Sequence, residues 1–372
     1  MKQKELFLQL LKAGIQNVDF SILPDQNTDW DDLLDQAAEH GLVGWMWSAI
    51  TKLPKECQPP RQQLINWGLS AEDVADAYYR QKSAINKLVS LCGKNSIRVL
   101  LLKGEGLSYL YPKPEYRFSS DIDIFLFGDY EKGNKVLADD KYDFGGRHSM
   151  FVFDGENVEN HVTLIHTTTK IQKKVEHFLE SSLDQAILTP QGYYILEPYA
   201  NIVFLLMHSL SHMDSVWALT IKNVVDFYMS LKTYADRQAI RPEKLLSIVD
   251  DLNMGDAFEL MLSLSERFLS DTFSEYHNHI IPEEDIEKAE RIIDGRISLP
   301  PYSPQMSLIK RLKLRKERHS QIRWVYRYSP RKIQDRILAG FRHEVSFELQ
   351  RLLGMRSGVG LREEIRHRIN GE

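Results

Sequence analysis

The stretch from Ser119 to Phe127 reads SSDIDIFLF and sets two carboxylates at the start of an apolar run. In a β-strand successive side chains point to opposite faces, so we expect Asp121 and Asp123 to project together while Ile122 and Ile124 are buried on the other side. Two neighbouring carboxylates repel each other unless a cation lies between them, and such hard oxygen ligands favour Mg²⁺ or Mn²⁺. The stretch therefore predicts a strand with a metal site for phosphoryl chemistry. The alternative is a D-x-D pattern that arises by chance in an exposed loop or edge strand.

A second strand and a glycine turn precede this acidic strand. Residues 97–102 form an aliphatic run of strand length, which Lys103 and Gly104 close, and residues 105–111 read as a short helix. A glycine between strand and helix lets the backbone approach a phosphate closely, and the free N–H groups at a helix start face that anion. We therefore expect the turn to hold a triphosphate and the acidic strand to hold its metals.

These residues resemble the nucleotidyltransferase superfamily typified by DNA polymerase β. The shared pattern is Lys103-Gly104 followed by Arg117-x-x-x-Asp121-x-Asp123, and its order is similar to that of a bacterial family of uncharacterised nucleotidyltransferases. The similarity covers about residues 30–230 and also includes residues 31–53, 158–161, 207–212 and 224–226. It implies an α+β fold with an α/β core, in which a mixed sheet is flanked by N- and C-terminal helical regions. It further implies transfer of a nucleoside monophosphate from an NTP, such as ATP, to an acceptor, with release of pyrophosphate.

The resemblance implies which acids hold the metal. Asp121 and Asp123 are expected to bind two Mg²⁺ or Mn²⁺ ions that bridge the triphosphate. Glu159 lies on a second predicted strand, over residues 158–165, after a turn at 154–157. We expect Glu159 to complete one metal site and to act as general base. The alternative for Glu159 is an exposed glutamate near a turn.

Nucleotide binding is expected of Lys103, Gly104, Arg117 and Ser120. Lys103 offers a point charge and Arg117 a planar, bidentate phosphate contact. The alternatives are a solvated lysine and an ion pair between Arg117 and one of the two aspartates. Most members of the superfamily follow the glycine with a serine that contacts the terminal phosphates, whereas this chain has Glu105. That departure also admits a catalytically inactive nucleotide-binding or regulatory protein.

Several histidines and one further acid are candidates for contacting the acceptor or supporting the metal ligands. His161 shares a strand face with Glu159, and His166 follows it. His208 and His212 lie four residues apart in an apolar helix over residues 201–213 and therefore share a face. The resemblance implies that this helix packs beside the sheet with its histidines and Asp226 toward the cleft. Structural histidines and a zinc site are the alternatives, although zinc lacks support from a glutamate between the two histidines or a nearby cysteine.

The chain divides into four predicted regions. Residues 1–92 form a helical region with helices over 5–13, 31–53 and 61–91, separated by prolines. Residues 93–195 form the nucleotidyltransferase core, which includes a helix over 130–138 and a strand over 149–153. Residues 196–300 form a helical domain that Pro198 opens, and residues 301–372 form a basic helical region.

The composition of the chain indicates the cellular compartment in which we expect the protein. The chain has 372 residues, 43% of them hydrophobic, and no apolar run of bilayer length, so we expect a cytoplasmic protein. Cys57 and Cys92 are too few for a disulfide framework, which agrees with a reducing compartment.

The C-terminal region is strongly basic. From Tyr302 to Glu372 the sequence has 17 Lys or Arg against 7 Asp or Glu, with aromatic residues at Trp324, Tyr326 and Tyr328. Such a segment can bind nucleic acid, above all RNA, or an anionic membrane surface, and the alternative is a solvated helix face. The expected partners are therefore an NTP and an acceptor that is a small molecule, a protein or RNA.

Overall fold

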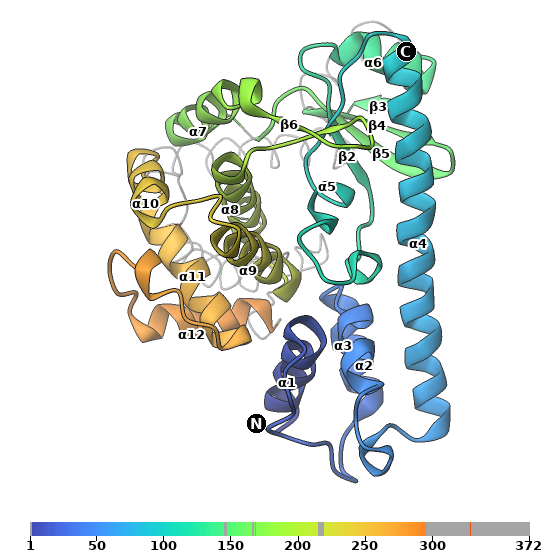
Figure 1. The fold of residues 1–372 in the computed structure, drawn as a ribbon, viewed down its shortest axis with the longest axis vertical. Coiled ribbons are helices and arrows are strands. Elements are labelled where there is room, and N and C mark those ends of the chain that lie inside the picture. The colour runs from blue at the N-terminus through green and yellow to red at the C-terminus, as the bar shows by residue number, and fades with distance from the viewer. Residues whose placement is uncertain are drawn as a thin grey trace, which may run out of the picture.

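The protein folds as helices around one mixed β-sheet, and its computed structural model describes residues 2–144, 147–165, 167, 169–214, 219–294 and 328. The sheet has seven strands in the order β3-β4-β5-β2-β1-β7-β6. Figure 1 shows the sheet near one end of the long helix α4, with helices α1 to α3 near its other end and α7 to α12 across from it. The predicted α+β fold with flanking helical regions is confirmed.

The N-terminal region contains α1 (Lys2–Gln16), α2 (Trp30–Glu39), α3 (Val43–Ile50) and α4 (Arg61–Lys94). The prediction of one helix over 31–53 is wrong, because the chain turns at Gly41 with a φ of +66° and divides that segment into α2 and α3. A glycine in the left-handed region ends a helix at little steric cost. The prediction for residues 61–91 is confirmed by α4, whose 34 residues span about 50 Å at 1.5 Å per residue.

The strands are β1 (Leu100–Leu101), β2 (Ile122–Phe125), β3 (Asp143–Phe144), β4 (His148–Phe153), β5 (Glu156–His161), β6 (Ile187–Leu188) and β7 (Tyr194–Ile195). Strand β2 pairs antiparallel with β1 and parallel with β5. The predicted turn at 154–157 is shorter, because Asp154 (φ +51°) and Gly155 (φ +84°) both adopt positive φ and pairing resumes at Glu156. Two such residues form a tight hairpin turn. Strand β5 begins at Glu156 and ends at His161 rather than at residue 165.

The two faces of the sheet are chemically different. Ile122 and Ile124 of β2 pack into a hydrophobic cluster with α4 and with α6 (Tyr130–Ala138), as the predicted alternation requires. Asp123 therefore lies on the opposite face of β2. Asn160 of β5 is bonded to Asn134 of α6 on the first face, which leaves its neighbours Glu159 and His161 on the second. The acidic residues thus share the face away from α4.

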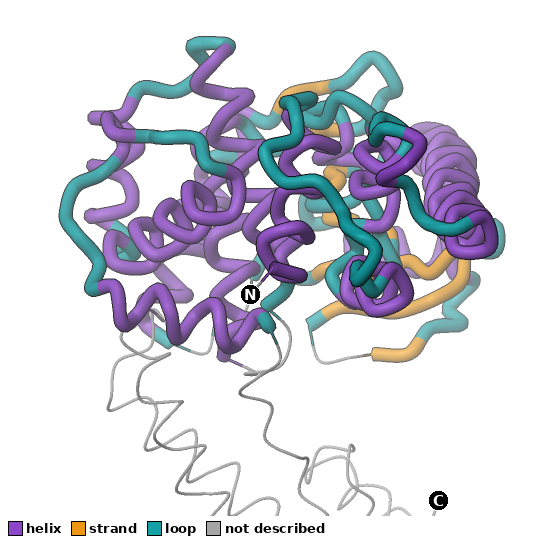
Figure 2. The backbone as a smooth tube through the Cα atoms, turned by 90° about the horizontal axis from the view of Figure 1, so that it is seen from below, coloured by secondary structure: helices purple, strands orange, loops and turns teal. Residues whose placement is uncertain are grey.

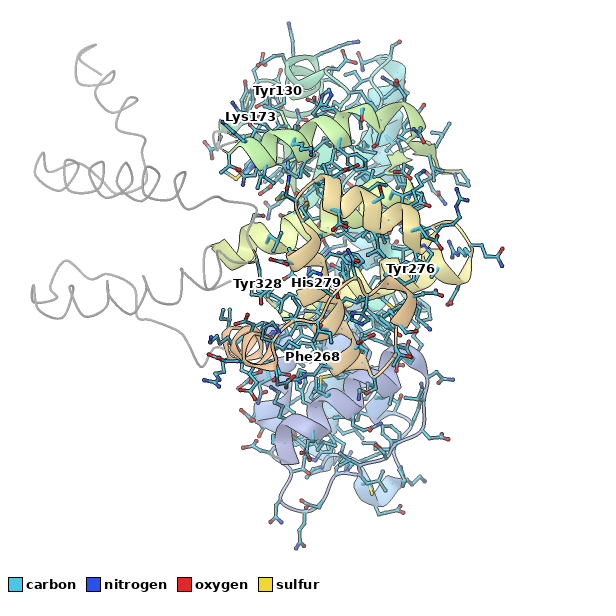
Figure 3. The ribbon with its side chains drawn as sticks, turned by 90° about the vertical axis from the view of Figure 1, so that its left-hand side faces the viewer. Tyr130, Lys173, Phe268, Tyr276, His279 and Tyr328 are labelled. Atoms are coloured by element: carbon cyan, nitrogen blue, oxygen red, sulfur yellow. The ribbon has the colours of Figure 1, made fainter. Side chains whose placement is uncertain are left out.

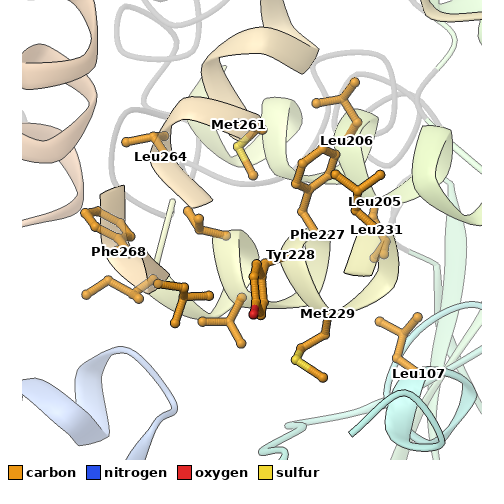
Figure 4. Packing of buried hydrophobic residues seen from close by; sticks show 14 of the residues in the cluster. Leu107, Leu205, Leu206, Phe227, Tyr228, Met229, Leu231, Met261, Leu264 and Phe268 are labelled. Carbon is orange, nitrogen blue, oxygen red and sulfur yellow. The ribbon is translucent and has the colours of Figure 1, made fainter. Parts of the chain in front are cut away.

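The remaining helices are α5 (Glu105–Ser108), α7 (Lys170–Ser181), α8 (Pro198–Asp214), α9 (Ile221–Asp236), α10 (Pro242–Asp251), α11 (Gly255–Leu269) and α12 (Glu283–Ile293). Their core is shown in Figure 4, where Phe227 and Tyr228 of α9 and Met261 of α11 belong to one hydrophobic cluster. The same hydrophobic cluster includes Trp45 of α3, so the N-terminal helices share a core with the helical domain. The predicted domain boundaries therefore do not coincide with separate cores.

Tyr328, the last residue that the structure describes, lies against helix α12. Figure 3 labels Tyr328 beside these helices, and its buried hydroxyl donates a hydrogen bond to Asp285. The other residues of the predicted basic region, 301–372, lie outside the described residues. Figure 2 shows how helix dominates the described backbone, yet none of these helices has both the length and the apolar character that crossing a bilayer requires.

Candidate active site

Three carboxylates converge on the face of the sheet that α4 does not cover. Asp123 of β2 and Glu159 of β5 are paired residues of a parallel ladder, and Asp121 immediately precedes β2. Asp121, Asp123 and Glu159 each offer a carboxylate oxygen within 4.8 Å of the others. The strand register therefore brings together the three acids that the sequence predicts, and their oxygen atoms form a donor set that suits Mg²⁺.

Lys103 lies directly against the acid cluster. The N–H of Leu102 donates to the carbonyl of Asp123 at 3.1 Å, which continues the β1–β2 pairing and places Lys103 beside Asp123. The Lys103 Nζ is 2.9 Å from Asp123 Oδ2. Burial alone would raise the pKa of Asp123, but the Lys103 ammonium and His161 outweigh it and lower that pKa. Lys103 is thus an ion-paired residue of the site rather than a solvated lysine.

Asp121 carries the uncompensated negative charge of the cluster. Its pKa is raised by burial and by repulsion from Asp123 and Glu159, against which the attraction of Lys103 is smaller. Ser120 Oγ donates to Asp121 Oδ1 at 3.2 Å. A raised carboxyl pKa next to other acids indicates a place where a cation would be favourable.

Two histidines border Glu159. His161 Nε2 is 2.9 Å from Asp123 Oδ1 and 3.5 Å from Glu159 Oε2, while His148 Nε2 of β4 is 3.6 Å from Glu159 Oε1. The bond from His161 lowers the pKa of Glu159 even though burial opposes this. A carboxylate that stays ionised can bind a metal ion, so this lowered pKa agrees with the ligand role predicted for Glu159.

The glycine turn is held in a conformation that few residues other than glycine adopt. Gly104 has φ +56° and ψ −122°, and an added Cβ would lie 3.1 Å from Ser119 Oγ. Glu105 is directed away from the acid cluster, since it accepts a hydrogen bond from the Ser108 hydroxyl at 2.9 Å and pairs with Lys82 of α4 at 3.5 Å. Helix α5 has only four residues, fewer than the segment 105–111 predicted.

Arg117 has partners other than the expected phosphate. Its guanidinium is buried and donates from Nε to Asp226 Oδ1 at 2.9 Å and from Nη2 to Asp226 Oδ2 at 2.8 Å. Its Nη1 donates to the carbonyl of Gly104 at 3.2 Å, and Tyr111 donates its hydroxyl to Asp226. Asp226 is therefore buried beneath the glycine turn instead of open to the site. The ion pair that the sequence offered as an alternative exists, but with a carboxylate of α9.

The other predicted histidines are not among the described residues that form the acid cluster. His208 on α8 is half-buried and stacks on Phe204, with ring centroids 6.1 Å apart. The backbone of His212 belongs to α8, but its side chain lies outside the described part of the structure, as does His166. A contact between these histidines and the acceptor stays a prediction.

Sequence reasoning missed two basic groups at the site, in addition to His148. Lys222, in the first turn of α9, has its pKa lowered to about 8 by desolvation and by the charges of Arg117 and Lys103, with Asp121 among the nearby acids. Arg147 precedes β4, and the charges of Glu159 and Asp123 act on it. For His148 a signal existed, because extending β4 by one residue places it opposite His161. For Lys222 the sequence offers none, since α9 is distant along the chain.

A mixed sheet that presents paired aspartates, a third acid on a parallel strand and an adjoining Lys-Gly turn defines a nucleotidyltransferase-type site. The chain belongs to the family described as uncharacterised nucleotidyltransferase, whose match covers residues 26–270. This range includes the acid cluster, Lys103 and the Arg117–Asp226 pair. The searches of curated proteins and of solved structures find no match. Membership supports a transferase that acts on nucleotides.

Proposed function

We propose that the protein is a Mg²⁺-dependent nucleotidyltransferase, which transfers a nucleoside monophosphate from an NTP to an acceptor and releases pyrophosphate. The observation that carries this proposal is the convergence of Asp121, Asp123 and Glu159 within 4.8 Å beside Lys103. A site with three acids and a lysine is suited to bringing a polyphosphate and its cations together, because the carboxylates attract the cations and the ammonium attracts the phosphate oxygens.

The residues present fit a metal of the Mg²⁺ type. The three carboxylates are hard oxygen donors, and Asp121 in particular lies in a surplus of negative charge. Asp121, Asp123 and Glu159 would hold Mg²⁺, which supplies charge neutralisation for the attacking and leaving oxygens of an in-line displacement.

The chain's own cations would bind and orient the triphosphate. Lys103 already contacts Asp123. The Nζ of Lys222 of α9 lies 3.5 Å from the carbonyl oxygen of Phe118, three residues before Asp121. Arg117 would act on the nucleotide indirectly, because its hydrogen bond to the Gly104 carbonyl holds the turn that carries Lys103. Ser120, bonded to Asp121, would orient that carboxylate.

A nucleotide-binding protein without turnover is the second candidate, and Glu105 is the residue that favours it. A serine hydroxyl for the terminal phosphates is missing at this position. The carboxylate of Glu105 is, however, engaged by Ser108 and Lys82, so it adds no free negative charge toward the phosphates. The geometry therefore supports turnover better than its loss.

The test combines titration calorimetry with ATP and Mg²⁺ and an assay of pyrophosphate release, supplied with cell extract as the source of acceptors. Asp121→Asn removes a charge that its neighbours repel, so the fold should be kept while pyrophosphate release falls by on the order of 10²-fold or more. The matched control is Asp139→Asn, which makes the same change at a carboxylate that is 90% exposed. Nucleotide binding without any release in the wild type would favour the second candidate, and equal release by the wild type and Asp121→Asn would refute the metal assignment.

The finer expectations stay predictions. The acceptor is expected to be a small molecule, a protein or RNA, and the RNA case rests on the basic region over residues 301–372. A cytoplasmic location is likewise expected from the sequence alone.

A further inference from the structure

A second group of metal-ligating side chains adjoins the acid cluster and shares one residue with it. His148 of β4 and His161 of β5 are directly opposite each other in an antiparallel ladder, and Glu159 lies two residues before His161 on the same face. The imidazole ring centroids are 5.2 Å apart. Adjacent strands thus fix two histidines and a glutamate by backbone register rather than by a flexible loop.

The distances in this group match a metal coordination sphere. His148 Nε2 and Glu159 Oε1 are 3.6 Å apart, and His161 Nε2 and Glu159 Oε2 are 3.5 Å apart. In a tetrahedral zinc site with bonds of about 2.1 Å, neighbouring ligand atoms are about 3.4 Å apart. One ligand atom from each of the three residues lies within 4.8 Å of the other two. An ion would therefore need only small side-chain adjustments.

The hydrogen bonding of the two imidazole rings is incomplete. Among the described residues, the buried Nδ1 atoms of both His148 and His161 have no hydrogen-bond partner, and His161 is almost fully buried. Their Nε2 atoms approach the carboxylates of Glu159 and, for His161, of Asp123. The Nε2 atoms of both rings therefore face the Glu159 carboxylate, which is where a metal ion would be placed.

The donor atoms select a different ion from the one expected at Asp121 and Asp123. Imidazole nitrogen suits Zn²⁺ and similar transition-metal ions, whereas an all-oxygen set suits Mg²⁺. We propose that His148, His161 and Glu159 form a second metal site, which binds a single Zn²⁺ ion and leaves a coordination position for water or substrate. Because Glu159 belongs to both groups, the ion is placed next to the nucleotidyltransferase site.

The test measures metal binding by the full-length protein and does not depend on transferase activity. Purified protein is freed of metal, loaded with Zn²⁺ or with Co²⁺ in the presence of excess Mg²⁺, and examined for bound metal by mass spectrometry and for the visible absorption of Co²⁺. The wild type should bind one equivalent with nitrogen ligation. His148→Ala and His148→Gln should each weaken Zn²⁺ binding by at least ~10²-fold, since even residues behind the ligands contribute 10–100-fold.

Two controls separate this site from its neighbours. His177→Ala removes an exposed histidine of α7 and should leave Zn²⁺ binding unchanged. Asp121→Asn should also retain it, because Asp121 belongs to the Mg²⁺ group alone. Loss of Zn²⁺ binding in Asp121→Asn with retention in both folded His148 variants would overturn the proposal, as would the absence of any bound Zn²⁺ in the wild type. Failure of pyrophosphate release, in contrast, would count only against the proposed transferase activity.

Discussion

Replacing Arg117 by lysine should destabilise the protein more than it weakens nucleotide binding. The arginine makes two charge-assisted bonds to Asp226, at 2.9 and 2.8 Å, and one to the Gly104 carbonyl at 3.2 Å. A lysine in its place keeps the charge but reaches only one of these acceptors well. The second bond to Asp226 contributes about 1.5–3 kcal/mol and the longer one to the Gly104 carbonyl about 0.5–1.5 kcal/mol, so losing both should lower the free energy of unfolding by about 2–4.5 kcal/mol.

Removing the charge altogether should have a larger effect. Arg117→Met leaves Asp226 as a buried carboxylate that, among the described residues, keeps the hydrogen bond from Tyr111, and breaking a buried ion pair in this way costs about 3–5 kcal/mol. The matched control is Lys87→Met, which breaks an ion pair with Asp154 at 2.7 Å in which the lysine side chain is 59% exposed. Exposed ion pairs contribute about 0–1 kcal/mol.

Urea unfolding followed by tryptophan fluorescence measures these differences, and calorimetry with ATP and Mg²⁺ measures nucleotide affinity in the same variants. From the most to the least stable, we expect the order wild type, Lys87→Met, Arg117→Lys and Arg117→Met. If Arg117→Lys were as stable as the control while binding nucleotide more weakly, the structural role of Arg117 would be refuted. Arg117 would then be interpreted as the planar phosphate contact that the sequence suggested.

Four further predictions concern the site and the basic region. Glu159→Gln should lower turnover by at least ~10²-fold with nucleotide binding nearly unchanged, and wild-type turnover in this variant would remove Glu159 from the mechanism. Gly104→Ala should destabilise the protein by about 1–3 kcal/mol in urea unfolding, because alanine is strained at this positive φ, and an unchanged midpoint would argue against the described turn. Lys222→Met should weaken nucleotide binding by about 1–3 kcal/mol in calorimetry without loss of stability; equal affinity would place its ammonium outside the phosphate site. If the region over 301–372 binds RNA, filter retention of RNA should fall steeply with salt, whereas retention independent of salt would exclude phosphate contacts.

The local features of the site were accessible from the sequence. The alternation of Asp121 to Ile124 gave the acidic and apolar faces of β2, and Gly104 marked the turn before α5 because few other residues adopt its conformation. Glu159 was predicted as the third acid because it lies on the same face of a recognisable strand as His161. These predictions depend on near neighbours in the chain, where periodicity and steric limits act directly.

The partners across long sequence separations were not accessible. Arg117 was predicted to be a phosphate ligand because it belongs to the pattern that contains Asp121 and Asp123. Nothing in that segment indicates that Asp226 of α9 lies beneath Arg117. The break between α2 and α3 was missed for another reason, since apolar residues continue from α2 into the almost wholly buried α3 and the helix-ending signal of Gly41 was overlooked. The ion pair depends on tertiary packing, which a single sequence does not encode in a local pattern, whereas the break depends on a local glycine.

The Arg117–Asp226 pair also determines when the site can assemble while the chain is being synthesised on the ribosome. The acids of β2 emerge long before β5 and longer still before α9, yet the arginine that fixes the Gly104 turn stays without its buried counter-charge until Asp226 has been made. An unpaired buried charge is too costly to persist, so the turn that carries Lys103 should close only when the helical half joins the sheet. The growing chain therefore lacks an assembled form of the proposed nucleotide site until Asp226 has been made, and ribosome-bound chains that stop before residue 226 should remain open to proteases at the Lys103 turn.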